Sequence, residues 1–282
     1  MPANSLPRRV AKRALAPVLN ERTYRYAQAL AMARDLRSGS LSEPEIELIP
    51  YAVREGESAL DVGANYGMWT YPLSRAVGPN GRVYAFEPVP FTVDTLRLVV
   101  RLLRLRNVEI VPKACGEREG SIEFAVPVQD SGAISAGQSH AAARDDDRTG
   151  REQHVRWNAT RTISCDVLAL DEILPEHEEI SLLKADIEGA ELFALRGAER
   201  TLERHAPTVI CEINPWFLEG FQISLEELIA FFAERDYGLY RYLTDPARLE
   251  PVADPATVDE DNYVFVPSRR TDRFEVLLSR GG

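Results

Sequence analysis

Short apolar runs and helically spaced apolar residues alternate along the chain from about residue 57 onward. Apolar runs that end at turn residues predict strands over 58–62, 82–86, 108–111, 121–126, 182–185, 208–213, 238–243 and 263–266. Apolar positions three and four residues apart predict helices over 69–77, 93–105, 190–204 and 225–234. Repeated strand–helix–strand units of this kind predict an α/β fold, in which a mostly parallel sheet carries helices on both faces.

The same pattern divides the 282 residues of the chain into a core domain and two flanking segments. We expect the domain over residues 45–267, between an N-terminal helical extension over 1–44 and a C-terminal tail over 268–282. The segment 127–160 breaks the periodicity with three glycines and few apolar residues, which predicts a lid or a disordered insertion. Its two histidines would lie near a substrate in the first case and would be exposed loop residues in the second.

Basic side chains are concentrated at the N-terminus. Residues 1–40 hold eight Lys and Arg against two acidic residues, a net charge of +6, whereas the whole chain carries −11. A basic helix of this kind can contact a membrane surface peripherally, an acidic partner or a second subunit of a homodimer. The alternative is a solvated helical cap on the domain, which the narrow apolar face of this segment favours.

Overall composition excludes some classes of protein. A net charge of −11 and an isoelectric point near 5.0 argue against a dedicated nucleic-acid-binding protein. No run approaches about 18 consecutive apolar residues, so we expect no transmembrane segment. The three scattered cysteines and the lack of a secretory signal predict a cytoplasmic protein.

The first predicted strand leads into a glycine-containing turn, Asp61-Val62-Gly63-Ala64-Asn65-Tyr66-Gly67. In parallel α/β sheets, ligands bind beyond the carboxyl ends of the strands. Glycine allows the backbone to approach such a ligand closely, and the free N–H groups of the next helix favour an anionic group. Glu87 ends the second strand, where its carboxylate can accept hydrogen bonds from both ribose hydroxyls of an adenosine.

The residue at the centre of this turn distinguishes between two kinds of cofactor. Dinucleotide sites carry a middle glycine that makes room for the pyrophosphate, and here that position is Asn65. S-adenosylmethionine has no pyrophosphate, and its amino group can be held by Asp61 or a nearby carbonyl. The turn therefore favours S-adenosylmethionine over a nicotinamide dinucleotide. We expect the adenine at residues 114–116, with Glu117 as an acidic partner.

Carboxylates gather at the ends of two later strands. Asp186 and Glu188 follow one predicted strand, and Glu212 and Asn214 end the next one. This group can remove a proton from a hydroxyl, position an acceptor, or hold an ion such as Mg²⁺, for which Asp186, Glu212 and Asn214 are the candidate ligands. A purely structural role in capping helices is the remaining alternative.

Three motifs together resemble the FkbM-type methyltransferases. They are the turn at 61–67, Phe86-Glu87-Pro88, and Lys184-Ala185-Asp186-Ile187-Glu188-Gly189-Ala190-Glu191 with Gly197-Ala198 after it. The resemblance extends over about residues 45–267. It implies a Rossmann-like seven-stranded methyltransferase fold, S-adenosylmethionine as the methyl donor, and O-methylation of a hydroxylated small molecule such as a sugar, a glycolipid or another natural product.

The resemblance and the residue patterns together give a set of expected site residues. The cofactor pocket is expected to contain Asp61, Gly63, Ala64, Asn65, Gly67, Glu87 and Asp186. Catalytic roles are expected for Asp186, Glu188 and Glu212. Two alternatives stay open at this point: a nicotinamide-dependent oxidoreductase of the same fold class, and a cofactor-binding partner protein without catalytic activity.

Overall fold

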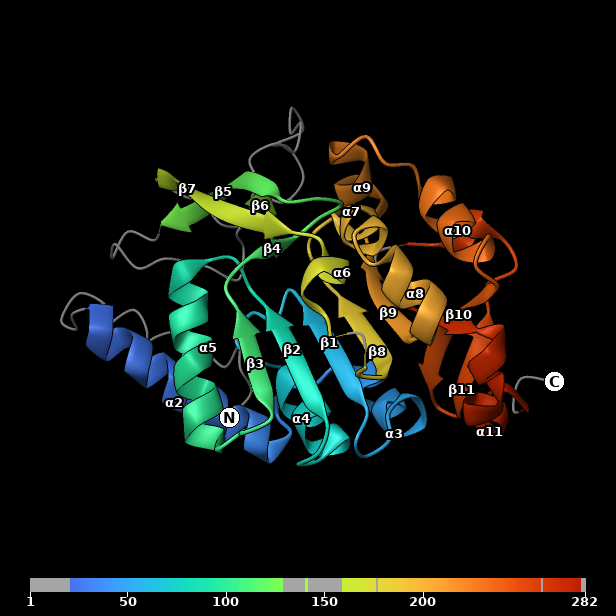
Figure 1. Cartoon of the computed structure of the whole chain (residues 1–282), viewed down its shortest axis with the longest axis horizontal. Coiled ribbons are helices and arrows are strands. Elements are labelled where there is room, and N and C mark those ends of the chain that lie inside the picture. Colours follow the sequence, from blue (N-terminus) through green and yellow to red (C-terminus); the bar gives the residue numbers. More distant parts are fainter. Residues whose placement is uncertain (1–20, 129–139, 142–158, 176, 260, 280–282) are drawn as a thin grey trace.

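The computed structural model describes residues 21–128, 140–141, 159–175, 177–259 and 261–279. Eight strands form one central sheet in the order β11-β10-β12-β9-β8-β1-β2-β3 (Figure 1). Their bounds in chain order are β1 Ser58–Val62, β2 Arg82–Phe86, β3 Val108–Val111, β8 Ile180–Ala185, β9 Thr208–Ile213, β10 Tyr237–Thr244, β11 Ala247–Pro251 and β12 Asp261–Pro267.

The sheet is parallel from β9 through β8, β1 and β2 to β3, whereas β12, β10 and β11 pair antiparallel. The predicted Rossmann-like α/β class is confirmed, but the expected strand count of seven is wrong. The eighth strand is β11, which forms a hairpin with β10. Its sequence, Ala-Arg-Leu-Glu-Pro, buries only Leu249, so it lacks the apolar run by which the other strands were predicted.

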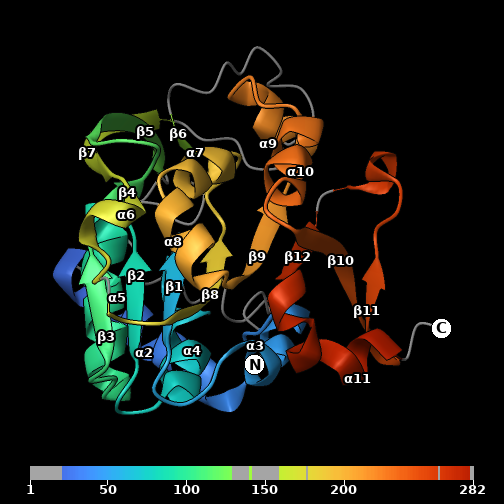
Figure 2. The same ribbon diagram turned by 45° about the vertical axis from the view of Figure 1, so that its right-hand side comes forward.

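Helices cover both faces of the sheet, which explains why β1 and β8 are buried along their whole length (Figure 2). One face packs against α3 (Ile49–Ala52), α4 (Thr70–Val77), α5 (Pro90–Leu103) and α11 (Glu275–Leu278). The other packs against α7 (Glu191–Arg196), α8 (Glu199–His205) and α10 (Leu225–Ala233). Shorter elements are η1 Pro44–Leu48, α6 Leu170–Ile173, α9 Pro215–Gly220, η3 Pro255–Thr257 and η4 Ser268–Phe274.

The helix expected over 190–204 is divided into α7 and α8 around Gly197. A Cβ at Gly197 would lie 2.0 Å from the carbonyl oxygen of Gly116, so the two backbones pass in direct contact here. This contact joins α7 and α8 to a second sheet. The helical periodicity in the sequence continues across the break and therefore does not reveal it.

A second sheet of four strands lies above the carboxyl ends of β1, β2 and β3 (Figures 1 and 2). Its strands are β4 Ala114–Cys115, β5 Gly120–Val128, β6 His140–Ala141 and β7 Ala159–Leu168, in the order β4-β7-β5-β6, and we call it the roof sheet. The insertion expected over 127–160 thus begins and ends inside β5 and β7, and it contributes β6. Its remaining residues, including His154, lie outside the described part of the chain.

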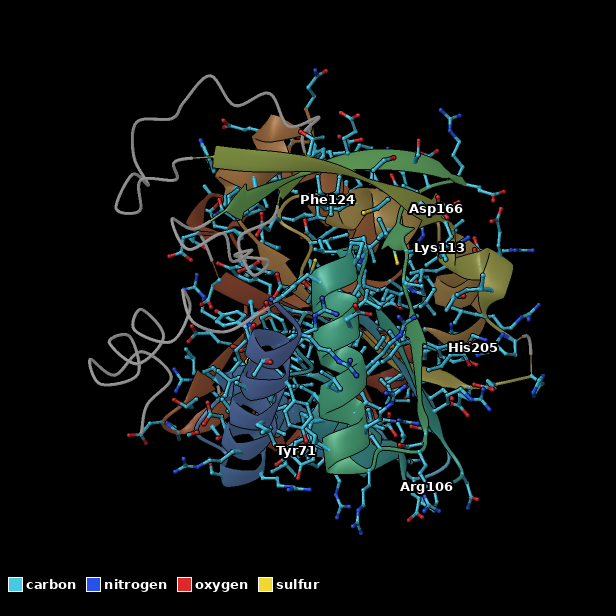
Figure 3. All side chains as sticks on the ribbon, turned by 90° about the vertical axis from the view of Figure 1, so that its left-hand side faces the viewer. Tyr71, Arg106, Lys113, Phe124, Asp166 and His205 are labelled. Atoms are coloured by element: carbon cyan, nitrogen blue, oxygen red, sulfur yellow. The ribbon has the colours of Figure 1, made fainter. Side chains whose placement is uncertain are left out.

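The N-terminal extension contains α2, Glu21–Ser38, which packs along α5 (Figure 3). Ala29, Ala33 and Leu36 are buried against Val99 and Leu103 of α5. The described part of the extension is therefore a helix packed on the domain, whereas the narrow apolar face, at residues 15–19, lies outside the described residues. Among the described helices, none has the length and apolar character needed to cross a membrane.

We expected a C-terminal tail from residue 268 onward. Instead, η4 and α11 are folded against the sheet. Phe274 and Leu277 are almost fully buried. Arg273 makes two hydrogen bonds to the carboxylate of Glu57, at 2.7 and 3.1 Å, and the two side chains are 10% and 11% exposed. This ion pair joins the end of the chain to the residue that precedes β1.

We expect Arg273→Ala to destabilise the fold by about 3 kcal/mol, because it leaves a buried carboxylate without its cation. Burial alone would raise the pKa of Glu57, but hydrogen bonds from Arg273 and Arg54 hold that pKa below its usual value. The stabilisation is therefore present above about pH 4.3, the ordinary value for glutamate, and is lost as the pH falls further. Urea titrations at pH 7 and pH 3.5 would measure it. Arg248→Ala, which removes a more exposed pair with Glu250, is the control, and equal losses in both variants would contradict the prediction.

Candidate active site

A cavity of about 320 Å³ lies at the carboxyl ends of β1, β2, β8 and β9, beneath the roof sheet. Its floor includes Gly63, Asn65 and Glu87 from the ends of β1 and β2. Asp186, Glu188 and Glu212 line the side formed by β8 and β9. The structure therefore brings the predicted cofactor turn and the predicted carboxylates to the walls of one cavity.

The turn after β1 is held against both neighbouring strands. The backbone N–H groups of Gly63 and Ala64 donate to the carbonyl of Phe86, at 3.0 and 2.9 Å. Gly63 has φ +86°, and a Cβ there would lie 1.9 Å from the carbonyl oxygen of Asp186. No other amino acid fits this position without moving the end of β8. Asn65 has φ +47°, a conformation that asparagine tolerates better than most residues.

Glu87 is 6% exposed and uses both carboxylate oxygens within the protein. One accepts from the backbone N–H of Asn65 at 3.0 Å, and the other from that of Val89 at 2.9 Å. Burial raises the pKa of Glu87 to about 7, although these hydrogen bonds act in the opposite direction. Each oxygen keeps a further lone pair toward the cavity, which suits the predicted contact with two ribose hydroxyls.

Asp61 does not line the cavity, contrary to the expected cofactor contact. Its side chain is buried beneath the turn and accepts a hydrogen bond from the hydroxyl of Thr70, in the first turn of α4. Burial raises its pKa to about 7. Ala64 and Gly67 also lie off the cavity wall, and Gly67 instead packs against Leu96. These three residues shape and support the turn, while Gly63 and Asn65 present it to a ligand.

Asp186 and Glu212 form a carboxyl pair at the opposite wall. Ala185 and Cys211 are register partners in β8 and β9, so the residues that follow them also lie next to each other. The two carboxyl groups face each other within hydrogen-bonding reach. Burial and then the neighbouring Asp186 raise the pKa of Glu212, and Lys184 opposes this effect. A carboxylate with a raised pKa is a stronger base than an ordinary glutamate.

Lys184 lies behind this pair and is 1% exposed. Its Nζ donates to the carboxamide oxygen of Asn262 at 2.6 Å and lies 5.4 Å from the ring centre of Trp69. Asn262 belongs to β12, on the far side of β9, and is the register partner of Glu212. The lysine side chain therefore crosses β9 close to Glu212 and brings a positive charge to this part of the sheet.

The turn between β8 and α7 carries Glu188 into the cavity wall. Glu188 and Gly189 have φ +53° and +101°, and Glu191 accepts from the backbone N–H groups of Ile187 and Gly189 at 3.0 and 3.2 Å. Glu191 is buried and its pKa is raised to about 7 by that burial. Glu191 thus stabilises the turn, and Glu188 lines the cavity.

Asn214 does not join the carboxylates. Its carboxamide oxygen accepts from the backbone N–H groups of Trp216 and Phe217 and caps α9. Among the described residues, no three His, Cys, Asp or Glu side chains converge where they could hold a metal ion. The expected set of Asp186, Glu212 and Asn214 therefore does not fit a magnesium site, and we assign no step to a metal.

Several cavity residues were not anticipated from the sequence. They are Lys113, Ile122 and Phe124, from or near the roof sheet, and Val89, from the start of α5. Ala114 and Cys115 line the cavity, whereas Glu117 is exposed and is not among the cavity residues. The sequence shows that Ile122 and Phe124 alternate with residues that are exposed. It does not show which surface these two side chains cover.

The arrangement has two chemically distinct ends. Backbone groups, Glu87 and apolar side chains suit a nucleoside, whereas the carboxylates Asp186, Glu188 and Glu212 suit a group that carries protons or positive charge. No pyrophosphate is needed to fill this cavity, and the close approach of Gly63 to Asp186 makes the nucleoside end and the carboxylate end continuous.

Known proteins with similar sequences are methyltransferases. "Methyltransferase 1" of Beauveria bassiana is 28% identical over 151 residues, which are 50% of this chain and 57% of that protein. "Methyltransferase sdnD" of Sordaria araneosa is 24% identical over 185 residues, 60% of this chain and 70% of that protein. The chain thus spans little more than half of the Beauveria protein.

One match is to a solved structure. Methyltransferase FkbM from Methylobacillus flagellatus is 18% identical, with a TM-score of 0.45, and the match covers 78% of this chain and 50% of that one. A family model described as the methyltransferase FkbM domain matches residues 61–239, which contain the turn, Glu87 and the carboxylate pair. On the strength of that match, which extends over more than half of its length, the chain belongs to the FkbM methyltransferase family.

Proposed function

We propose that this protein transfers the methyl group of S-adenosylmethionine to a hydroxyl group of a sugar, a glycolipid or another natural product. The observation that carries the proposal is the carboxyl pair of Asp186 and Glu212 at the wall of the cavity that begins at the Gly63 turn. Family membership supports the methyl donor. The hydroxyl acceptor is inferred from the base that the structure provides.

The nucleoside end of the cavity fits the donor. Gly63 and Asn65 offer backbone within contact distance, Glu87 accepts from the ribose, and Phe124 and Cys115 provide an apolar surface for the adenine. When bound, S-adenosylmethionine supplies a methyl group already activated by the sulfonium, which leaves as a neutral thioether. The chain's task is therefore to align the acceptor and to remove its proton.

Glu212 is suited to removing that proton. A hydroxyl group is a weak acid, so a carboxylate with an ordinary pKa takes its proton poorly, and raising the pKa of the carboxyl narrows this difference. Burial and Asp186 raise the pKa of Glu212 in this way. As the new carbon–oxygen bond forms and the carbon–sulfur bond breaks, the hydroxyl proton passes to Glu212. Asp186 and Glu188 hold the acceptor by accepting hydrogen bonds from its other hydroxyl groups.

Phe217 forms the apolar part of the acceptor end, where Gly189 packs directly against it. A ring next to several carboxylates can bind the C–H face of a polyhydroxylated ring while the carboxylates accept hydrogen bonds from its hydroxyls.

The three cysteines of the described structure are free and buried, which fits the reducing cytoplasm. We keep a non-catalytic, cofactor-binding role as the competing proposal, because it requires the same donor pocket but not Glu212.

A screen of hydroxylated acceptors with radiolabelled S-adenosylmethionine tests the function directly. We expect label to be transferred to a sugar or another hydroxylated compound, and mass spectrometry of the product to place the methyl group on oxygen. Transfer to nitrogen or carbon would reject O-methylation. Binding of S-adenosylhomocysteine without transfer to any acceptor would favour the non-catalytic role.

Glu212→Gln should lower kcat by about 100-fold or more, because it removes the base while keeping the size of the side chain. The wild-type rate should fall as the pH is lowered through the raised pKa of Glu212, since only the ionised carboxylate accepts a proton. The pKa of Glu212 is raised to about 9, so initial rates from about pH 6 to about pH 10.5 measure both effects. Glu219→Gln, on α9 outside the cavity wall, serves as the control. An unchanged kcat in Glu212→Gln would exclude this residue as the base.

Gly63→Ala should weaken binding of S-adenosylhomocysteine by about tenfold or more, equivalent to 1.4 kcal/mol, because the added Cβ forces the turn away from Asp186. Isothermal titration calorimetry measures the affinity, and a melting curve checks that the variant is folded. Gly120→Ala is the matched control, since a Cβ there meets no atom within 4 Å. Equal affinities in the two variants would show that the turn does not contact the cofactor.

A further inference from the structure

Helix α2 packs behind the cavity wall although it lies far from the cavity residues in sequence. It precedes the region matched by the family model, residues 61–239, and the sequence alone identified it only as a basic extension. Figure 3 shows α2 beside α5, with Phe124 on the roof sheet above them. Its first turns are the part that concerns the site.

Tyr24 of α2 packs into a cluster that joins three elements. The buried centre of this cluster is Val89 and Phe91 at the start of α5, and Tyr24 packs against it together with Phe124 and Ile163 of the roof sheet. Val89 and Phe124 both line the cavity. Tyr24 and the roof sheet therefore pack against the same two residues, of which Val89 is a cavity residue.

Arg25 fixes α2 in this position. Its guanidinium forms an ion pair with Asp94 of α5 at 2.5 Å, and it lies 5.3 Å from the ring centre of Phe91. This ion pair and the contact with the ring attach the first turns of α2 to α5.

Among the described residues, one further contact between the roof sheet and this part of the domain lies next to Val89. The thiol of Cys165 on β7 donates to the carbonyl of Pro88 at 3.2 Å, next to Val89. A thiol is a weak donor, so this bond adds little to the docking of the sheet. The apolar cluster around Tyr24 is the larger contact between the roof sheet and the start of α5.

We propose that α2 is a positioning element of the cofactor site, in which Tyr24 holds the roof sheet closed against α5 and so completes the apolar wall for the donor's nucleoside. The proposal rests on the proposed function, because it assumes that this cavity binds S-adenosylmethionine. It assigns a role in binding to a residue that does not itself line the cavity. The basic character of α2 serves its attachment to Asp94 and α5 in this interpretation.

The size of the effect follows from the fraction of molecules with a closed roof. A ligand that binds only the closed form has an apparent Kd equal to its intrinsic Kd divided by that fraction. If Tyr24→Ala leaves the roof closed in about one molecule in ten, the apparent Kd rises about tenfold. Tyr24→Phe keeps the ring and should bind like the wild type.

The test measures binding of S-adenosylhomocysteine to the full-length chain by calorimetry, with a melting curve for every variant. We expect Tyr24→Ala to bind about tenfold more weakly, and Tyr24→Phe to stay within about twofold of the wild type. Two variants of the same helix are controls. Tyr26→Ala alters a side chain that is 48% exposed, and Leu36→Ala destabilises the buried contact with α5 at the far end of α2. Leu36→Ala should lower the melting temperature without changing the Kd.

Hydrogen exchange provides a readout that needs no ligand. In Tyr24→Ala, the amides of residues 114–124 should exchange several times faster than in the wild type, whereas those of β1 should not change. Wild-type affinity in Tyr24→Ala, or an equal loss of affinity in Leu36→Ala, would overturn the positioning role. If the wild type itself binds no S-adenosylhomocysteine, the proposed function fails, and the exchange data still decide whether Tyr24 holds the roof sheet.

Discussion

The contact between Gly63 and the carbonyl of Asp186 is the constraint on which the rest of the site depends. It brings the turn after β1 against the end of β8, with no room for even a methyl group. Because of this contact, the floor for a nucleoside and the carboxyl pair of Asp186 and Glu212 belong to one cavity. The supporting residues, Asp61 beneath the turn and Glu191 beneath the loop after β8, keep the two backbone segments in place.

Burial sets the chemistry of this edge of the sheet. Asp61, Glu87 and Glu191 all have pKa values raised to about 7. Burial removes each carboxyl group from water, and the hydrogen bonds that it accepts offset only part of this effect on the pKa. Lys184 is the cation placed among the carboxyl groups of β8 and β9, and Asn262 holds its ammonium from the next strand.

The roof sheet and α2 complete the cavity from parts of the chain that do not belong to the central sheet. The roof sheet supplies Ile122 and Phe124, and both Phe124 and Tyr24 of α2 pack against Val89 and Phe91 at the start of α5. The central sheet is covered by helices on both faces. The cavity therefore lies between a floor formed by the central sheet and a roof sheet that meets α2 at the start of α5.

The sequence by itself determined the strands around the site, the identity of the turn and Glu87, and the neighbouring ends of β8 and β9. These follow from local periodicity and from the rule that parallel strands end at one edge. It could not show that Asp61 points below the turn, that Asn214 caps α9, or that β11, η4 and α11 belong to the folded domain, because those outcomes depend on contacts between distant segments. Only the tertiary structure decided what covers the cavity. The apolar face of β5 and the first turn of α2 meet at α5, and the sequence does not show that meeting.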